Sequence, residues 1–342
     1  PKHIFEGKTA EEINAPDLWA NPVGSGPFIY DSEINGERME FVKNENYFLG
    51  APNIDRLIIR VTDAASMLAG LMNGELDMIG YGSVITDDWE MAKSQENLTT
   101  QSVPTTSYST LIFNTQKEYL TQEVRQALNM AINRQILVDG LLLGEGTPII
   151  TPIAPISPYY NDAVEVVYDP ETAKQMLADA GFPADQTLKF FISSGNAITE
   201  RCAALIVQNF AEVGVKVEIE QMDFPTLMSR MLEGEHDLGI IGSGGTMDPS
   251  ESREMIYPTS SCNFCQLQDT ELTDLIDAGN AELSLETRKP YFDEYQEKVV
   301  ERAAMGYLYT KNILTVYNNS MKNLHVEDFN GLNWSSWEWD KE

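Results

Sequence analysis

A phrase in this sequence recurs 160 residues further along the chain, and this repeat limits the possible folds more than any other feature. LMNGELDMIGYGS occupies residues 71–83, and MLEGEHDLGIIGS occupies residues 231–243. Six residues coincide at this single offset, which exceeds what shared helix and strand patterns usually produce. The coincident pairs are Asp63/Asp223, Gly74/Gly234, Glu75/Glu235, Asp77/Asp237, Gly82/Gly242 and Ser83/Ser243.

Each copy has the pattern of a strand, a helix and a second strand. An Asp after the first strand is placed to cap the helix, an apolar stripe follows the helix, and a Gly ends it where φ must be positive. The predicted strands cover 56–61 and 76–80 in the first copy, and 215–222 and 236–241 in the second. The repeat unit is therefore predicted to be β-α-β, with one copy in each of two lobes.

Strands and helices also alternate in the rest of the chain, which predicts an α/β fold with parallel-rich sheets covered on both faces. Because 342 residues are too many for one core of ordinary size, we expect two lobes. We assign residues 1–150 to lobe I, 151–305 to lobe II and 306–342 to a return into lobe I. The proline-rich stretch 144–167 is interpreted as a loop or crossover between the lobes.

The chain is strongly acidic, with 53 Asp and Glu against 23 Lys and Arg and a net charge of −30. Phosphate binding needs clustered Lys and Arg, so this balance argues against a nucleic-acid partner. We interpret the acidity as a solvated surface rather than as a site for cationic ligands. No apolar run approaches the roughly 18 residues that span a bilayer.

Motifs of catalysis are missing from the sequence. There is no H-E-x-x-H, no G-x-S-x-G and no glycine-rich phosphate loop followed by Lys. His236 lies at the start of a predicted strand beside Asp237, where we expect a surface or strand-edge histidine rather than a general base. We interpret Glu75, Asp77, Glu235 and Asp237 as residues that stabilise turns, and we do not expect an enzyme.

The three cysteines are Cys202, Cys262 and Cys265, and the last two form a C-x-x-C pair. No second pair and no nearby His complete a zinc-binding set. A local disulfide and two plain small residues both remain open for Cys262 and Cys265. No metal or cofactor site is predicted.

Small polar residues follow several predicted strands, and ligands of open α/β sheets bind beyond the carboxyl ends of strands. Three such loops are Tyr81-Gly82-Ser83, Ser194-Gly195-Asn196 and Ser243 to Thr246. We expect them to border a cleft between the lobes, with Gly82-Ser83 opposite Gly242-Ser243. Closure of two lobes over such a cleft suits the capture of a small molecule or peptide. For the tryptophans Trp334, Trp337 and Trp339, half-buried packing is favoured over stacking on a ligand.

Several ordered motifs resemble one known family. They include NPVGSGPF, NENYFLGAPNIDRLIIRV, TQEVRQALNMAINRQILVDGLLLGEGTP, YDPETAKQMLADAGF and GVKVEIEQMDFPTLMSRMLEGEHDLGIIG. Together they resemble the family 5 extracytoplasmic solute-binding proteins of ABC transporters, which include dipeptide-, oligopeptide- and nickel-binding receptors. The resemblance implies a two-lobed periplasmic-binding-protein-like α/β fold of class II. It also implies a C-terminal fragment that lacks the N-terminal part of lobe I, on the order of 100–200 residues, and an upstream signal segment.

The resemblance also bears on the ligand site. Family members hold peptides with an acidic residue three positions before an Asp-Pro pair; here the pair is Asp248-Pro249 and the earlier position is Gly245. Phe224 matches an aromatic that faces the cleft, although a core role for it is equally open. The predicted ligand-binding residues are Tyr81, Gly82, Ser83, Ser194, Asn196, Phe224, Ser243, Gly244, Gly245, Thr246 and Asp248.

The function that this resemblance implies is the substrate-binding component of an ABC importer. We expect a monomer that binds a short peptide by hinge closure and delivers it to ABC permease subunits at the membrane. The expected location is extracytoplasmic, either periplasmic or lipid-anchored on the cell surface. The alternatives are a receptor for an oligosaccharide, with Trp334 or Trp337 as a stacking platform, a receptor for a nickel or other metal chelate, and, less favoured, a hydrolase.

Overall fold

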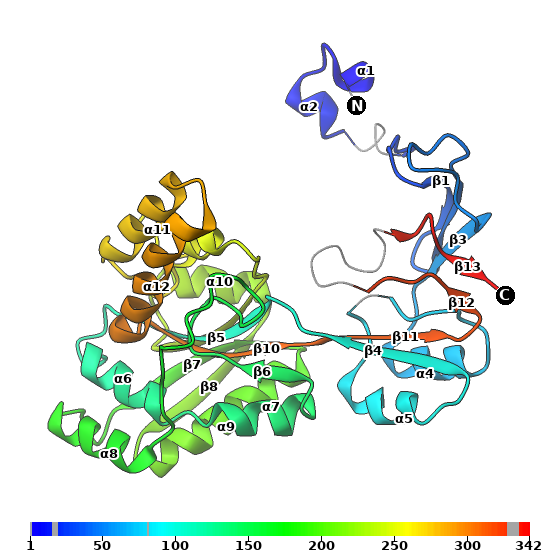
Figure 1. Ribbon diagram of the computed structural model, residues 1–342. Coiled ribbons are helices and arrows are strands. Elements are labelled where there is room, and N and C mark those ends of the chain that lie inside the picture. Colours follow the sequence, from blue (N-terminus) through cyan, green and yellow to red (C-terminus); the bar gives the residue numbers. More distant parts are fainter. Residues whose placement is uncertain (1, 16–19, 81, 327–334) are drawn as a thin grey trace. The chain divides into compact units, whose positions relative to one another are not determined.

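The computed structural model describes residues 2–15, 20–80, 82–326 and 335–342, and it divides the chain into two compact units (Figure 1). Unit 1 consists of Pro1–Val103 and Ile313–Glu342, and unit 2 of Pro104–Asn312. The chain therefore passes between the units after Val103 and after Asn312, whereas the sequence analysis places the lobe boundaries after 150 and 305. The difference arises because the first strand and helices after Val103 pack within unit 2.

Unit 2 is built on a six-stranded sheet. The strand order is β6 (Gly146–Pro148), β10 (Met305–Lys311), β5 (Tyr108–Phe113), β9 (Leu238–Ser243), β7 (Thr187–Ser193) and β8 (Lys216–Met222). Strand β7 pairs parallel with β8 and β9, while β5 pairs antiparallel with β9 and β10, and β6 antiparallel with β10. The sheet is thus mixed rather than parallel-rich, because the chain enters unit 2 through β5 and leaves it through the antiparallel neighbour β10.

Helices cover both faces of this sheet, as the alternating pattern predicts. Successive strand residues point to opposite faces, so Leu111 and Phe113 enter one buried core and Ile112 enters another. The first core includes residues of α6 (Gln122–Met130), α7 (Arg134–Leu142), α8 (Pro170–Asp179) and α9 (Ala197–Glu212). The second includes residues of α10 (Phe224–Leu232), α11 (Glu271–Ala281) and α12 (Leu285–Arg302).

The proline-rich stretch 144–167 lies inside unit 2 and does not connect the units. It contains β6 and then irregular chain, from which Ile149, Ile153 and Tyr159 enter the second core. Its prolines interrupt regular structure, but its apolar residues still pack against the sheet. The predicted crossover between lobes is therefore part of the unit 2 core.

Unit 1 contains short strands and helices. Its elements are α1 (Lys2–Phe5), α2 (Ala10–Ile13), β1 (Phe28–Ile34), β2 (Arg38–Lys43), β3 (Arg56–Arg60), α4 (Ala64–Met72), α5 (Trp89–Lys93), β4 (Leu98–Val103), β11 (Ile313–Asn318), β12 (Met321–Lys322) and β13 (Asp340–Lys341). Strands β1, β2 and β3 form one antiparallel sheet, and β4 pairs with β11. Residues Leu68, Leu71 and Trp89 pack with Val316 in a small buried core.

The two sequence copies form matching helices, α4 and α10. Gly74 and Gly234 follow these helices with φ of 75° and 74°, the left-handed conformation that the repeat predicts. The second strands differ. In the first copy only an isolated bridge joins Met78 to Tyr317, so the predicted strand over 76–80 is wrong. The second copy ends in the full strand β9 and is a true β-α-β unit around β7.

Other expectations concern single residue types. All three cysteines are unpaired, so Cys262 and Cys265 are not bridged. Trp339 is buried and Trp337 is half-buried, as expected, while Trp334 lies outside the described residues.

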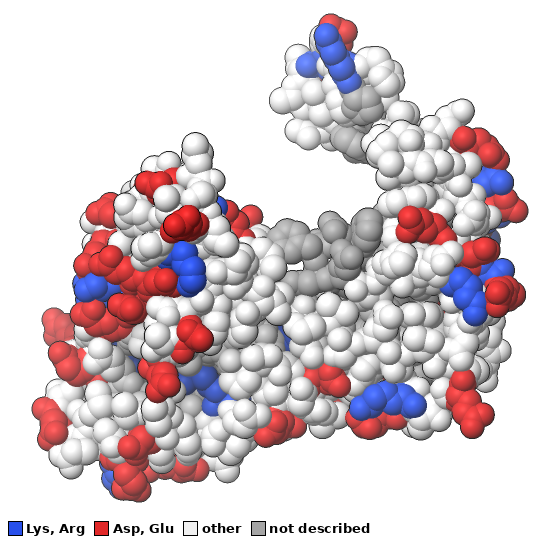
Figure 2. Space-filling model, viewed as in Figure 1, with Lys and Arg blue, Asp and Glu red and all other residues white. Residues whose placement is uncertain are grey.

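Within the described ranges, none of the helices combines the length and apolar character needed to cross a membrane. Figure 2 shows Asp and Glu side chains scattered over the visible surface, in line with a solvated acidic exterior.

Candidate functional site

The candidate site is a cavity at one edge of the unit 2 sheet, where β7, β9 and β10 end and β5 begins. The strand register places Tyr108 opposite Ser243 on one side and opposite Thr310 on the other. The cavity has a volume of about 470 Å³. Its lining residues are Ser107, Tyr108, Ser109, Ser193, Asn196, Ile198, Thr199, Phe224, Ile240, Ile241, Gly242, Ser243, Gly244, Tyr309 and Lys311. This edge is where open α/β sheets bind ligands.

The lining combines hydroxyl groups with an apolar wall. Ser193 and Ser243 end neighbouring strands, and the Phe224 ring at the start of α10 is 57% exposed. Short hydroxyl side chains both donate and accept hydrogen bonds, which suits the amides of a peptide backbone. An exposed ring beside them offers a surface for apolar side chains. Phe224 therefore belongs to the cavity rather than to the core.

Four of the predicted ligand-binding residues line this cavity: Asn196, Phe224, Ser243 and Gly244. Asn196 also caps α9, because its Oδ1 accepts hydrogen bonds from the backbone N–H groups of Ile198 and Thr199, each at 3.1 Å. Ser194 lies in the same turn, is exposed, and donates its backbone N–H to Met222. Residues from the ends of β7 and β9 thus line one cavity within unit 2, while the predicted cleft between the lobes stays a prediction.

Gly245, Thr246 and Asp248 lie in the loop after β9 but not in the cavity lining. The Gly245 carbonyl accepts a hydrogen bond of 2.6 Å from Thr106 Oγ1, and the Thr246 hydroxyl donates to the Asp248 carbonyl. A Cβ atom at Gly245 would lie 1.9 Å from the Thr106 carbonyl oxygen. Only glycine fits there, so no side chain at this position can reach a ligand.

Asp248 is held by Arg288 instead of being presented to the cavity. The guanidinium donates from Nη1 to Oδ2 at 2.8 Å and from Nη2 to Oδ1 at 3.1 Å. Burial by itself raises the pKa of the Asp248 carboxyl, but hydrogen bonds from Arg288 and Ser250 outweigh this and hold the pKa at about 2. Asp248 also caps the short helix η2 (Pro249–Met255). Arg288 lies 40 residues away in α12, and no sequence signal links the two.

The predicted residues of the first copy lie in unit 1. Gly82 has φ of 73°, and the backbone N–H of Ser83 donates to Gly80, so a tight turn is present there. Tyr81 lies outside the described residues. The predicted approach of Gly82-Ser83 to Gly242-Ser243 across a cleft stays a prediction.

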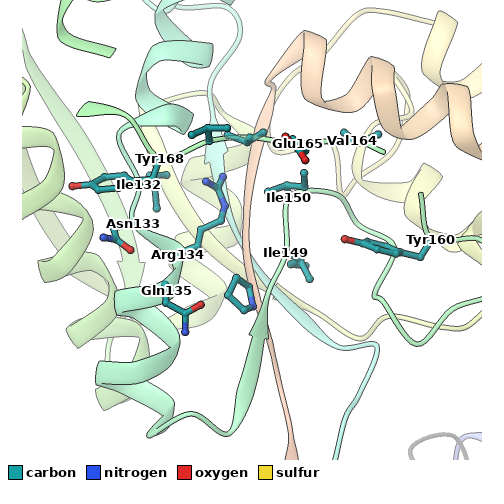
Figure 3. A pocket seen from close by; sticks show the side chains of 13 residues that line it. Ile132, Asn133, Arg134, Gln135, Ile149, Ile150, Tyr160, Val164, Glu165 and Tyr168 are labelled. Atoms are coloured by element: carbon teal, nitrogen blue, oxygen red, sulfur yellow. The ribbon is translucent and has the colours of Figure 1, made fainter. Parts of the chain in front are cut away.

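A second cavity of unit 2, of about 350 Å³, is less suited to a ligand (Figure 3). Figure 3 shows the Arg134 side chain extending from α7 into this space. Its guanidinium donates to the Tyr307 carbonyl at 2.6 Å and to the Asn129 carbonyl and side-chain oxygen at 3.1 and 3.0 Å. Burial lowers the pKa of Arg134 to about 10, so it stays charged at neutral pH. This cation therefore ties α7 to β10.

The described residues provide no cluster of three or more His, Cys, Asp or Glu side chains that is arranged to hold a metal ion. His236 is fully buried, which contradicts the expected surface or strand-edge position. His236 is buried because it lies just before β9, which is an inner strand between β5 and β7 in the sheet of unit 2. Burial lowers the pKa of His236 to about 4, so the imidazole is neutral at ordinary pH and remote from solvent.

The chain therefore forms two α/β units, and unit 2 has a cavity of hydroxyl and apolar side chains at its strand ends. The model of the family "Bacterial extracellular solute-binding proteins, family 5 Middle" matches residues 2–263. The chain belongs to this family, which confirms the resemblance seen in the sequence and the predicted fold class.

The chain is also similar to individual proteins of known name. The chain is 30% identical over 297 residues to Heme-binding protein A of Haemophilus influenzae and 26% identical over 337 residues to Oligopeptide-binding protein AppA of Bacillus subtilis. These matches cover 84% and 91% of this chain but only 54% and 61% of the relatives. A solved structure of a putative peptide binding protein, AppA from Clostridium difficile, matches with a TM-score of 0.89 and 26% identity, covering 100% of this chain and 72% of that one.

Proposed function

We propose that the protein is the extracytoplasmic solute-binding component of an ABC importer and that its ligand is a short peptide. The cavity at the edge of the unit 2 sheet carries this proposal, because hydroxyl groups from three strand ends converge there beside an exposed aromatic ring. Such groups match the alternating donors and acceptors of a peptide backbone. Relatives named as oligopeptide- and di/tripeptide-binding proteins support the same ligand class.

In this proposal the protein acts as a monomer without covalent chemistry. The two passages of the chain, after Val103 and after Asn312, serve as the hinge about which unit 1 closes over the peptide. The closed form then docks on permease subunits at the membrane, and the protein is either periplasmic or anchored by a lipid at the cell surface. The family consists of binding proteins, which supports a receptor rather than an enzyme.

The test is a thermal-shift and calorimetry screen of the full-length protein. The panel contains peptides of two to nine residues, oligosaccharides, nickel–histidine and hemin, the last two because relatives or neighbours are named for such ligands. We expect a rise in Tm with peptides, of a size set by the ratio of ligand concentration to Kd. A shift with sugars alone, or turnover of a peptide, would contradict the proposal.

A pair of variants ties binding to the cavity. Ser243→Trp places a large ring at the end of β9, inside the cavity, and should abolish the peptide-induced shift. Ser229→Trp places the same ring on the exposed surface of α10 and should leave the shift intact. The unliganded Tm of each variant shows whether it is folded.

A further inference from the structure

We propose that this cavity receives the carboxylate end of its ligand, with the Lys311 ammonium as the charge partner, and that it offers no partner for a ligand amine. The inference rests on the proposed function and names the chemical class that the unit 2 site selects. Lys311 ends β10 and lines the cavity. The next strand in the sheet is β5, where Ser107, Tyr108 and Ser109 add hydroxyl groups to the same lining, and Ser243 and Ser193 follow on β9 and β7. An ammonium in a cavity that also holds hydroxyl donors is a suitable partner for a carboxylate.

The charge of the lining supports this inference. In a chain with 53 acidic and 23 basic residues, the lining residues that the structure describes include Lys311 and neither Asp nor Glu. Unlike charges attract and like charges repel more strongly beside a protein surface than in bulk water, because the effective dielectric is lower there. A single cation in an otherwise uncharged cavity therefore favours an anionic group and disfavours an ammonium.

Lys311 is also not neutralised within the described part of the chain, where no ion pair to its Nζ is found within 4.0 Å. The neighbouring carboxylate across the strand pair belongs to Glu145, which precedes Gly146, the register partner of Lys311. The Glu145 Oε2 accepts a hydrogen bond of 3.3 Å from the Asn312 side chain. The lysine charge is therefore available for a ligand.

The other carboxylates close to the lining are held by their own loops. Asp223 accepts hydrogen bonds from the backbone and side chain of Thr226, and Glu200 accepts from the Gly195 backbone N–H at 3.2 Å. Asp248 is paired with Arg288. Each carboxylate therefore already accepts hydrogen bonds from its own surroundings, and none of the three belongs to the cavity lining.

Gly245 directly follows Gly244, which lines the cavity. The contact of the Gly245 backbone with Thr106 excludes any side chain at this position. The described lining of this cavity thus holds an ammonium and no carboxylate.

The experiment compares matched ligands on the full-length protein by calorimetry. Each peptide that binds is tested as the free acid, the C-terminal amide and the N-acetyl derivative. We expect amidation to weaken binding about tenfold or more, as for the loss of a charge-assisted hydrogen bond. N-acetylation should change the Kd by less than about threefold, which is within the effect of a screened surface charge.

Two variants assign the effect to Lys311. Lys311→Met should weaken binding of the acid about tenfold and leave the amide unchanged, so that the variant no longer distinguishes the two. The control is Lys216→Met, at the exposed first residue of β8, which should leave both affinities unchanged. Equal losses for acid and amide in Lys311→Met would mean a structural role for the lysine and would overturn the inference.

The remaining outcomes separate this inference from the proposed function. If no peptide binds but hemin or nickel–histidine binds and loses affinity in Lys311→Met, the peptide function fails and the carboxylate inference stands. Binding of any ligand that is insensitive to the loss of its carboxylate would overturn the inference and leave the receptor function in place. A panel without any bound carboxylate compound would overturn both.

Discussion

The two copies of the repeated phrase fold into the same helix but into different surroundings. In the second copy, β8 and β9 both lie beside β7 in one sheet. In the first copy, β3 pairs with β2, while Met78 bridges to Tyr317 of β11. Helix and turn are decided by local residues, whereas the strand that follows forms only where a neighbouring strand is present to pair with it.

The equivalent residues Asp77 and Asp237 show how the surroundings of the two copies differ. Asp77 forms an exposed ion pair of 2.9 Å with Lys341. Asp237 is 3% exposed and accepts hydrogen bonds from the Tyr119 hydroxyl at 2.6 Å and the Lys189 backbone N–H at 2.8 Å. The turn-stabilising role predicted for both fits Asp77 better than Asp237, which joins β9 to β7 inside unit 2.

The largest expected difference in stability between the copies therefore comes from comparing the replacements of these two aspartates by alanine. Asp237→Ala removes a buried carboxylate and leaves the partly buried Tyr119 hydroxyl and Lys189 N–H without this acceptor, so we expect a loss of about 3 kcal/mol in the free energy of unfolding. Asp77→Ala should cost less than about 0.5 kcal/mol, as for other exposed pairs. Urea unfolding followed by circular dichroism measures both, and hydrogen exchange of β9 locates the first. Equal costs would show that the two sites are equivalent.

The pH dependence of stability should also distinguish the two copies. At the position just before the aspartates, the first copy has Leu76 and the second has His236. The pKa of native His236 is about 4, below its ordinary value of 6.5, because burial disfavours the charged ring. A hydrogen bond with the Phe264 backbone opposes this effect, and the charge of Lys117 adds a smaller contribution that lowers the pKa further. The unfolded chain therefore binds a proton below pH 6.5 that the native protein does not. Stability from this group is complete above pH 6.5 and falls by about 3 kcal/mol as the pH drops to 4.

The variant His236→Leu tests this by making the second copy resemble the first. The difference in unfolding free energy between variant and native protein should change by about 3 kcal/mol between pH 7 and pH 4, in favour of the variant at low pH. Urea unfolding across this range is the measurement. A constant difference at all pH values would show that His236 is not kept neutral by its surroundings.

A smaller loss of stability is expected from a change in side-chain packing in the second copy. Gly239 and Met231 occupy the positions of Ile79 and Leu71 in the first copy, and a Cβ at Gly239 would lie 2.4 Å from Met231 Cε. Gly239→Ala should therefore cost about 1–3 kcal/mol through overpacking. Combined with Met231→Ala, its added cost should fall, because the clashing methyl group is gone. Strict additivity in the double variant would contradict this contact.

The smallest effect is expected at the helix starts. The Asp223 carboxylate accepts a hydrogen bond from the Thr226 backbone N–H at 3.1 Å, whereas the Asp63 side chain makes no capping bond. Asp223→Ala should cost about 1 kcal/mol and Asp63→Ala only a few tenths. Thermal unfolding of the two variants gives the comparison, and a larger cost for Asp63 would reverse it.

Part of the site could be predicted from the sequence. The rest could not, because it depends on residues that lie far apart in the chain. The loops after β7 and β9 were predicted because small polar residues directly follow apolar strands. The role of Asp248 was not, because its partner Arg288 comes from a distant helix. The place of Lys311 in the cavity lining was not predicted, because it ends β10, the strand by which the chain leaves unit 2, and the predicted boundary at 306 assigned it to lobe I.

The sequence alone determined the family, the helices of both copies, and the glycines that end them, since capping, periodicity and positive φ depend on a few neighbouring residues. Only the tertiary structure decided which strands pair, where the units divide, and which charged groups are left for a ligand. Those outcomes depend on contacts between residues far apart in the chain, such as Thr106 with Gly245 and Arg288 with Asp248. No local pattern encodes such contacts.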